Sequence, residues 1–208
     1  MRIIAQLLVS NTKPVDKYKT KNTGQDSNIF FKSFLKSPLR TGSIVQSSPA
    51  LAKKMLEKID FQNTRCVVEL GGGAGIITRK ILKKMRPNAL LLCFEIEPAL
   101  AQKLRSIKDS RLIIVNDCAE NIDVYLKKCG FQKADCVVSG LPLASLPPQT
   151  SRNILRNIYA YLGSGGQYVQ FQYTLASLRQ IKYLFSSVAV SFVLLNFPPA
   201  FVYVCIKS

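Results

Sequence analysis

A carboxylate followed closely by a run of glycines is the first place in this sequence where residue types and spacing suggest chemistry. Glu69 comes two residues before the run from Gly71 to Gly75, and together they end an apolar stretch. Glycines let the chain turn sharply and let a ligand approach the backbone closely. A pyrophosphate would suit such a turn, but the carboxylate of Glu69 repels phosphate and attracts cations. The pattern therefore favours a ligand that carries an ammonium or sulfonium group.

Two further carboxylates follow the next two apolar stretches. Glu95 ends the stretch 91–95, and Asp117 follows the stretch 113–115. The carboxyl ends of parallel strands meet at one edge of an open sheet, where such sheets bind ligands. There Glu95 can accept hydrogen bonds from both hydroxyls of a ribose, and Asp117 can accept one from an adenine amino group. Three acids in this order favour S-adenosylmethionine as the ligand.

The elements that must position these acids alternate along the chain between strand-like and helix-like segments. Strand-like segments lie at 66–70, 90–95, 111–115, 134–139, 166–172, 188–195 and 201–206. Helix-like segments lie at 75–86, 98–107, 119–128, 151–162 and 175–184. This alternation predicts an α/β fold, a Rossmann-like seven-stranded sheet with helices on both faces. Residues 196–199 are too few for a parallel crossover, so the last strand is expected to run antiparallel.

The residues before the first strand are expected to form a helical extension. Ser48 and Pro49 suit an N-cap and a first helical position, and an apolar stripe predicts a helix from there to about Asp60. Residues 29–36 carry a second apolar stripe beside lysines, which fits either core packing or a basic helix on a membrane surface. The expected organisation is a flexible basic arm at 1–28 and one domain at 29–208, with N-terminal helices at 29–60 and the Rossmann-like core at 65–206.

The composition indicates an anionic partner and excludes several kinds of site. The 208 residues include 29 lysines and arginines against 12 acids, a net charge of +17. The basic excess lies towards the two ends, and residues 151–208 contain five basic side chains and no acid. Nucleic acid and an anionic membrane face both fit this balance. The sequence has no histidine and no C-x-x-C pair, so a histidine base is excluded and a zinc site is not expected.

The motif E-x-G-x-G-x-G from Glu69 to Gly75, followed by Glu95 and Asp117, resembles the class I S-adenosylmethionine-dependent methyltransferases. An antiparallel last strand matches that family too. Over about 30–206 the chain resembles one branch, the bacterial phospholipid N-methyltransferases, which convert phosphatidylethanolamine to phosphatidylcholine. The stretches that carry this second resemblance are 38–52 (PLRTGSIVQSSPALA), 138–143 (VSGLPL), 169–173 (VQFQY) and 196–200 (NFPPA).

The rRNA adenine N6-methyltransferases, the adenine dimethylase branch, are the alternative. Their fourth motif reads N-L-P-Y or N-L-P-F, in which the asparagine holds the adenine amine and the aromatic ring stacks on the base. Gly140 and Leu143 occupy those two positions here. A flipped base needs both hydrogen bonds and stacking, so these departures favour lipid over RNA.

The resemblance implies the site residues. The cofactor site is expected to comprise Glu69, Gly71, Gly73, Gly75, Glu95, Ile96, Asp117 and Cys118. Catalysis is expected to involve Gly140 and Leu141, whose turn carbonyls could orient an amine. Tyr173 is a candidate proton acceptor, and Tyr18 is a second candidate for that role. Substrate is expected to contact Arg40, Leu143 and Asn196.

The expected cofactor is S-adenosylmethionine, and no metal is expected. The expected partners are an anionic membrane surface and its phospholipid, with RNA as the less favoured partner. The protein is accordingly expected in the cytoplasm, at the inner face of the cell membrane. The oligomeric state is left open by the sequence.

Overall fold

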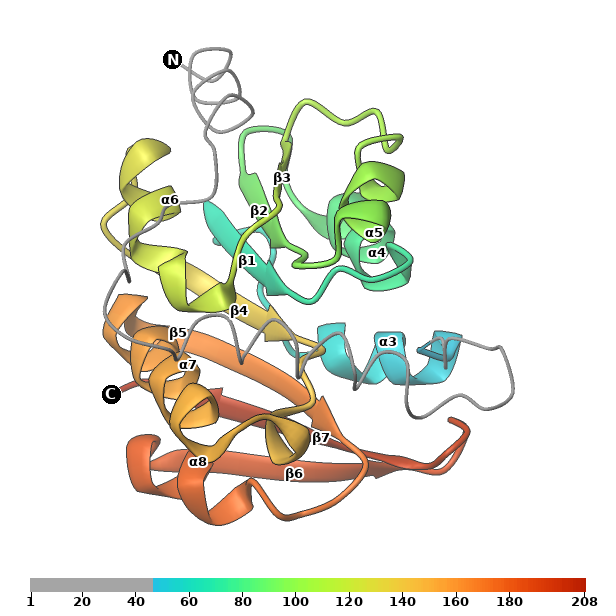
Figure 1. Cartoon of the computed structure of the whole chain (residues 1–208), viewed down its shortest axis with the longest axis vertical. Helices are drawn as coiled ribbons and strands as arrows, with labels where there is room; N and C mark the ends of the chain where they lie inside the picture. Colours follow the sequence, from blue (N-terminus) through green and yellow to red (C-terminus); the bar gives the residue numbers. More distant parts are fainter. Residues whose placement is uncertain (1–46) are drawn as a thin grey trace.

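A seven-stranded sheet in the order β3-β2-β1-β4-β5-β7-β6 forms the centre of the molecule (Figure 1). The computed structural model describes residues 47–208, so the arm at 1–28, the stripe at 29–36 and Arg40 lie outside the described residues. The strands are β1 (Cys66–Leu70), β2 (Leu90–Phe94), β3 (Leu112–Val115), β4 (Ala134–Ser139), β5 (Leu162–Gln172), β6 (Ser187–Val193) and β7 (Ala200–Ile206). The predicted seven-stranded α/β sheet is confirmed.

The first five strands are parallel, and β7 runs antiparallel between β5 and β6. Gln172 pairs with Phe201, so β7 begins at the edge of the sheet where β5 ends. The antiparallel last strand is as predicted, because the short connection 194–199 returns the chain at the same edge. That edge also holds the carboxyl ends of β1 to β4, where the acids were expected.

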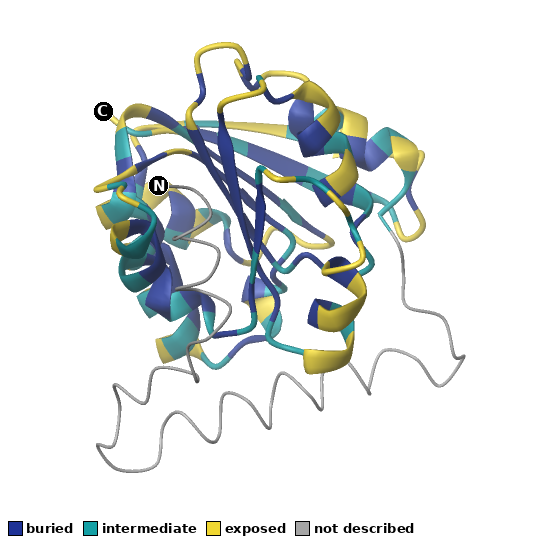
Figure 2. Ribbon diagram, turned by 90° about the horizontal axis from the view of Figure 1, so that it is seen from above, coloured by how far each residue is buried: buried dark blue, intermediate teal, exposed yellow. Residues whose placement is uncertain are grey.

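Two layers of helices cover the sheet, and Figure 2 shows the buried strands between them. The α-helices are α3 (Pro49–Leu56), α4 (Ile76–Lys84), α5 (Pro98–Leu104), α6 (Ile122–Lys128), α7 (Pro148–Tyr161) and α8 (Leu178–Leu184), with 3₁₀ turns η1 (Ala119–Asn121) and η2 (Leu143–Ser145). Apolar side chains of α3, α4 and α5 pack on one face, and those of α6, α7 and α8 pack on the other. Because both faces are covered, β1 and β2 are buried throughout, and apart from Glu69 they read as continuous apolar runs.

The helix α3 begins as its sequence predicts. The Ser48 hydroxyl accepts a hydrogen bond from the Leu51 backbone N–H at 3.0 Å, and Pro49 occupies the first turn. Leu51, Ala52, Met55 and Leu56 are buried and form the face that packs on the sheet.

The boundary between α7 and β5 differs from the prediction. The helix ends at Tyr161, close to the predicted end at residue 162, but β5 begins at Leu162 instead of at residue 166. The Gly165 N–H donates to the Lys207 carbonyl at 2.8 Å, and the Lys207 N–H donates to the Gly166 carbonyl at 3.0 Å. The chain after β7 thus pairs with a glycine segment that reads as a turn in the sequence, and this long-range pairing extends the strand.

Candidate functional site

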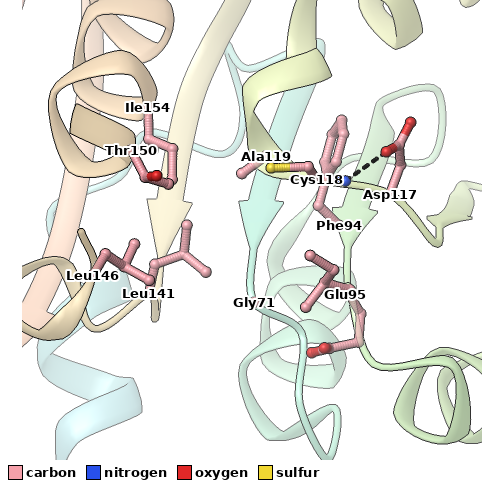
Figure 3. A pocket seen from close by; sticks show the side chains of 11 residues that line it. Gly71, Phe94, Glu95, Asp117, Cys118, Ala119, Leu141, Leu146, Thr150 and Ile154 are labelled. Carbon is pink, nitrogen blue, oxygen red and sulfur yellow. Dashed lines mark hydrogen bonds between the residues drawn. The ribbon is translucent and has the colours of Figure 1, made fainter. Parts of the chain in front are cut away.

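A pocket opens at the carboxyl edge of the sheet, between the ends of β1 and β2 and the start of α7 (Figure 3). It is lined by Gly71, Phe94, Glu95, Ile96, Asp117, Cys118, Ala119, Leu141, Leu146, Thr150 and Ile154. Six of these are predicted site residues: Gly71, Glu95, Ile96, Asp117, Cys118 and Leu141. The structure therefore brings residues from four separate strand ends into one site.

The glycine loop after β1 approaches its neighbours too closely for side chains. Gly71 has φ of +81°, and a Cβ there would lie 3.2 Å from the Leu141 side chain. A Cβ on Gly72 would lie 2.4 Å from the Cys93 sulfur, closer than atoms can approach. The loop ends at Gly75, the N-cap of α4. Gly71 lines the pocket, so its missing side chain leaves room there for a ligand.

Glu95 connects the glycine loop to the end of β2. Its Oε2 accepts a hydrogen bond from the Gly73 N–H at 2.8 Å, and its Oε1 accepts one from the Glu97 N–H at 2.9 Å. Burial raises the pKa of this carboxyl. A carboxylate offers about four acceptor positions, so each oxygen keeps capacity for one further donor. Two adjacent hydroxyls of a ribose would satisfy that capacity.

Donors from the protein already occupy most of the hydrogen-bond acceptor positions of Asp117, which the sequence does not indicate. Its Oδ1 accepts from the Cys118 N–H at 2.7 Å and the Asn121 amide at 3.1 Å, and its Oδ2 accepts from the Tyr125 hydroxyl at 2.8 Å. About one acceptor position is left, on Oδ2. That is sufficient for a single amino group.

Glu69 is buried, and Thr78 and Cys93 beside its carboxyl only partly offset the effect of burial on its pKa. It is 2% exposed, and neither carboxylate oxygen has a hydrogen bond among the described residues. Burial raises the pKa of Glu69 to about 8. The residue does not line the pocket: its neighbours include Thr78 of α4 and Cys93 of β2, beside the glycine loop. A buried unpaired carboxyl is costly and calls for an explanation, such as a cationic ligand.

The turn after β4 is fixed by two glutamines of β5. The side-chain amides of Gln170 and Gln172 both donate to the Leu141 carbonyl at 2.8 Å, and the Leu143 N–H donates to it at 2.9 Å. That carbonyl is therefore not available to orient an amine. The Gly140 carbonyl has no hydrogen bond within residues 47–208, and its neighbour Leu141 lines the pocket.

Leu143, Tyr173 and Asn196, which were also predicted to be catalytic or substrate residues, do not line the pocket. Leu143, the first residue of η2, is buried in the core. Leu146 lines the pocket instead. Tyr173 lies at the end of β5 and is 41% exposed. Asn196 is buried: its amide oxygen accepts from the Ser48 N–H at 3.0 Å, and its amide group donates to the Pro198 carbonyl at 2.6 Å. The roles assigned to these residues stay predictions.

Sequence reasoning missed the wall that α7 contributes. Thr150 and Ile154 are four residues apart, so they share one helix face, and that spacing was the available signal. Phe94, directly before Glu95, forms another wall and packs edge-on against Tyr125 at 5.5 Å between ring centroids. Together these residues give the pocket apolar sides suited to a flat ring and to alkyl groups.

The described residues contain no cluster of acids and cysteines that could hold a metal ion. Cys66, Cys93, Cys136 and Cys205 are buried, as expected for small apolar side chains. Cys118 lines the pocket, but burial raises the pKa of its thiol to about 12, so it is not a reactive thiolate. Within residues 47–208, no helix has the length and apolar character to cross a membrane.

The fold is similar to that of solved methyltransferases. The precorrin-6y C5,15-methyltransferase of Geobacter metallireducens superposes with a TM-score of 0.63 at 17% identity, over 81% of this chain and 93% of that one. An rRNA methylase of Streptococcus thermophilus gives a TM-score of 0.57 at 17% identity, over 80% of this chain and all of that one. At this identity the likeness defines the fold, that of the class I methyltransferases.

A comparison with curated sequences shows to which family of methyltransferases the chain belongs. The ornithine lipid N-methyltransferase of Singulisphaera acidiphila is 31% identical over 184 residues, which are 87% of this chain and 96% of that protein. No protein-family model matches the sequence. The chain belongs to the S-adenosylmethionine-dependent class I methyltransferases, in the same family as this lipid N-methyltransferase.

Proposed function

We propose that this protein transfers methyl groups from S-adenosylmethionine to the amine of phosphatidylethanolamine and its methylated intermediates, giving phosphatidylcholine. The observation that carries the proposal is the acceptor side of the pocket. Leu141, Leu146 and Ile154 form an apolar wall there, and neither an asparagine nor an aromatic ring stands at positions 140 and 143. Such a wall suits the alkyl part of an ethanolamine headgroup better than it suits a nucleobase.

The relative supports a lipid amine as the acceptor. Its name specifies ornithine lipid, so the chemistry shared with our proposal is N-methylation of an amine carried by a membrane lipid. The choice of phosphatidylethanolamine rests on the resemblance of the stretches at 138–143, 169–173 and 196–200 to the phospholipid branch. Peripheral association with the inner face of the cell membrane is part of the same proposal, because the lipid substrate stays in its bilayer.

The residues of the first three strand ends would hold the cofactor. Glu95 would accept the ribose hydroxyls, and Asp117 would accept the adenine amino group at its remaining position. Ile96, Phe94 and Ala119 would pack on the adenine ring. The unpaired, buried carboxyl of Glu69 fits a cationic ligand near the glycine loop.

When bound, S-adenosylmethionine supplies a methyl group on a positively charged sulfur. The protein must hold an amine lone pair in line with that methyl, and most of the catalysis is proximity and alignment. The amine must first lose a proton. With no histidine in the chain, the possible acceptors are a carboxylate, a tyrosine or water, and we propose that the proton passes to water. In the first two transfers the open Gly140 carbonyl would accept a hydrogen bond from a remaining N–H and hold the lone pair towards the pocket. The dimethylated amine has no N–H after it loses its proton, and the apolar wall would hold it instead.

Tyr173 is better suited to orienting the headgroup than to accepting a proton. Burial raises the pKa of its phenol above the ordinary value of 10. A tyrosine accepts a proton only as phenolate, so the raised pKa disfavours that role near neutral pH. The hydroxyl could still donate a hydrogen bond to a phosphate or carbonyl of the lipid.

The test is incubation with labelled S-adenosylmethionine and three acceptors in parallel: phosphatidylethanolamine vesicles, ornithine lipid vesicles and undermethylated ribosomal subunits. We expect label in mono-, di- and trimethylated phosphatidylethanolamine, separated by thin-layer chromatography, and at least about tenfold less label with Glu95→Ala at a cofactor concentration well below saturation. Label in ornithine lipid alone would support a lipid amine as the acceptor but contradict phosphatidylethanolamine as the substrate. Label in ribosomal RNA alone would overturn the proposal in favour of the rRNA methyltransferase.

A further inference from the structure

The connection between β6 and β7 exposes large apolar side chains to solvent. We call residues 194–199 the hairpin tip. Leu194 is 70% exposed, Leu195 78% and Phe197 89%. In Figure 1 this connection projects beyond the ends of the neighbouring strands. Contiguous apolar surface of this kind is rare on soluble proteins and marks sites of protein or membrane contact.

The register of the sheet places further apolar residues at the base of the tip. Phe192 pairs with Phe201, which pairs with Gln172, so the chain leaving β5 at Tyr173 lies beside the tip. Residues 173–176 are all exposed, and they include the apolar Leu175. The tip and this segment thus form one apolar border at the carboxyl edge, the edge at which the pocket opens.

The backbone of the tip satisfies part of its hydrogen-bonding need internally. The Ser48 hydroxyl donates to the Leu195 carbonyl at 2.8 Å, and the Asn196 amide donates to the Pro198 carbonyl at 2.6 Å. Pro198 and Pro199 have no N–H to satisfy. A backbone that enters lipid must pair its polar groups within the protein, whereas an ordinary surface loop can leave them to water. This feature favours a bilayer over an aqueous protein partner.

The charge distribution favours the same occupant. Residues 151–208 contain no acidic side chain, so nothing on β5 to β7 repels lipid phosphate. Arg179, in the first turn of α8 after the exposed segment, is itself exposed. Basic groups near an anionic leaflet add attraction to the apolar insertion.

We propose that the hairpin tip inserts into the surface of an anionic bilayer and holds the pocket against the lipid headgroups. The inference rests on the proposed lipid substrate for its purpose, but it concerns a separate surface. The tip would bury Leu194, Leu195 and Phe197 among the acyl chains near the interface. The pocket at the same edge would then meet a headgroup without the lipid leaving its leaflet.

The experiment is flotation of the full-length protein with vesicles of phosphatidylglycerol and phosphatidylethanolamine in equal amounts. Because Phe197 is almost fully exposed, Phe197→Ser should fold normally and partition about tenfold less than wild type. The double variant Leu194→Ser/Leu195→Ser should do the same. Tyr183→Ser is the matched control, since Tyr183 is 86% exposed but lies near the end of α8. It should float like wild type.

A second measurement separates this inference from the proposed function. All variants should bind S-adenosylmethionine like wild type and methylate a short-chain, water-soluble phosphatidylethanolamine equally, while the tip variants lose activity on vesicles. If wild type methylates neither form, the proposed function fails, and flotation alone still decides the docking. Tip variants that float like wild type overturn the inference. So do tip variants that melt at a clearly lower temperature, or that convert a dimer to a monomer, because the tip then packs on this chain or on a second copy.

Discussion

Replacing Glu69 by glutamine tests whether its buried carboxyl is kept for a cationic ligand. Burial raises the pKa of Glu69 from 4.5 to about 8 in the ligand-free protein. At pH 7 the protonated form therefore exceeds the ionised form by about tenfold, and ionising the group costs about 1.4 kcal/mol. An ammonium group beside the carboxylate would supply that free energy. Binding of S-adenosylmethionine should accordingly release close to one proton per protein molecule at pH 7.

The affinity should depend on pH in a way that identifies Glu69. Below about pH 7, affinity for S-adenosylmethionine should rise close to tenfold per pH unit, because each unit makes the ionised carboxylate about tenfold more available. In Glu69→Gln the amide cannot ionise, so binding should be weaker and nearly independent of pH in this range. Titration calorimetry in two buffers with different ionisation enthalpies measures affinity and proton release together. Equal affinity and equal proton release in the two proteins would refute the reasoning.

The same pKa affects the stability of the ligand-free protein. The pKa of Glu69 in the folded state lies above 4.5, its ordinary value, so the folded state holds the proton more tightly. The contribution of this group to stability should therefore fall as pH rises from about 4.5 to about 8, by up to about 5 kcal/mol. Urea unfolding should show Glu69→Gln matching wild type near pH 5 and exceeding it near pH 9. Glu57→Gln, at an exposed position, should leave the wild-type trend unchanged.

Four further substitutions test the rest of the site. Glu95→Ala should weaken S-adenosylmethionine binding by about 1.5–3 kcal/mol, the scale of a charged hydrogen bond, measured by calorimetry; unchanged affinity would remove Glu95 from the site. Gln170→Leu and Gln172→Leu should each lower kcat without changing cofactor affinity, because the Leu141 carbonyl loses a donor that fixes the turn. If these variants are less stable but the folded fraction has a normal kcat, the two glutamines have only a structural role. Tyr173→Phe should raise KM for lipid and leave the pH profile of kcat unshifted, whereas a shifted profile would restore the tyrosine as proton acceptor.

That several of the proposed cofactor residues lie around one pocket could be predicted, because the signals for their positions are local. Glu95 and Asp117 each stand at the end of an apolar run, and parallel strands place such ends at one edge whatever the strand order. The glycine loop carries its own signature, since Gly72 has no room for a Cβ. Strand order was not needed to bring these residues together.

The acceptor half depends on contacts between distant segments, which no local pattern encodes. Gln170 and Gln172 lie on the same face of β5. Their common acceptor, the Leu141 carbonyl, is brought to them by the pairing of β5 with β4. Leu143 was expected in the substrate wall, but the 3₁₀ turn η2 directs it into the core and leaves Leu146 at the pocket. The direction of a side chain in such a turn follows from tertiary packing rather than from the order of apolar residues.

This division of the pocket bears on how the substrate is selected. The half built by β1, β2 and β3 presents carboxylates and glycine backbone, which suit a nucleoside with a cationic tail. The half built by residues 140–154 presents mostly methyl groups together with the Thr150 side chain. A base held for methylation needs its edge hydrogen-bonded and its face stacked, whereas an amine on a flexible headgroup needs one acceptor and an apolar wall. Changes in acceptor choice should therefore arise from substitutions within 140–154, and substitutions within 69–118 should change cofactor affinity for every acceptor alike.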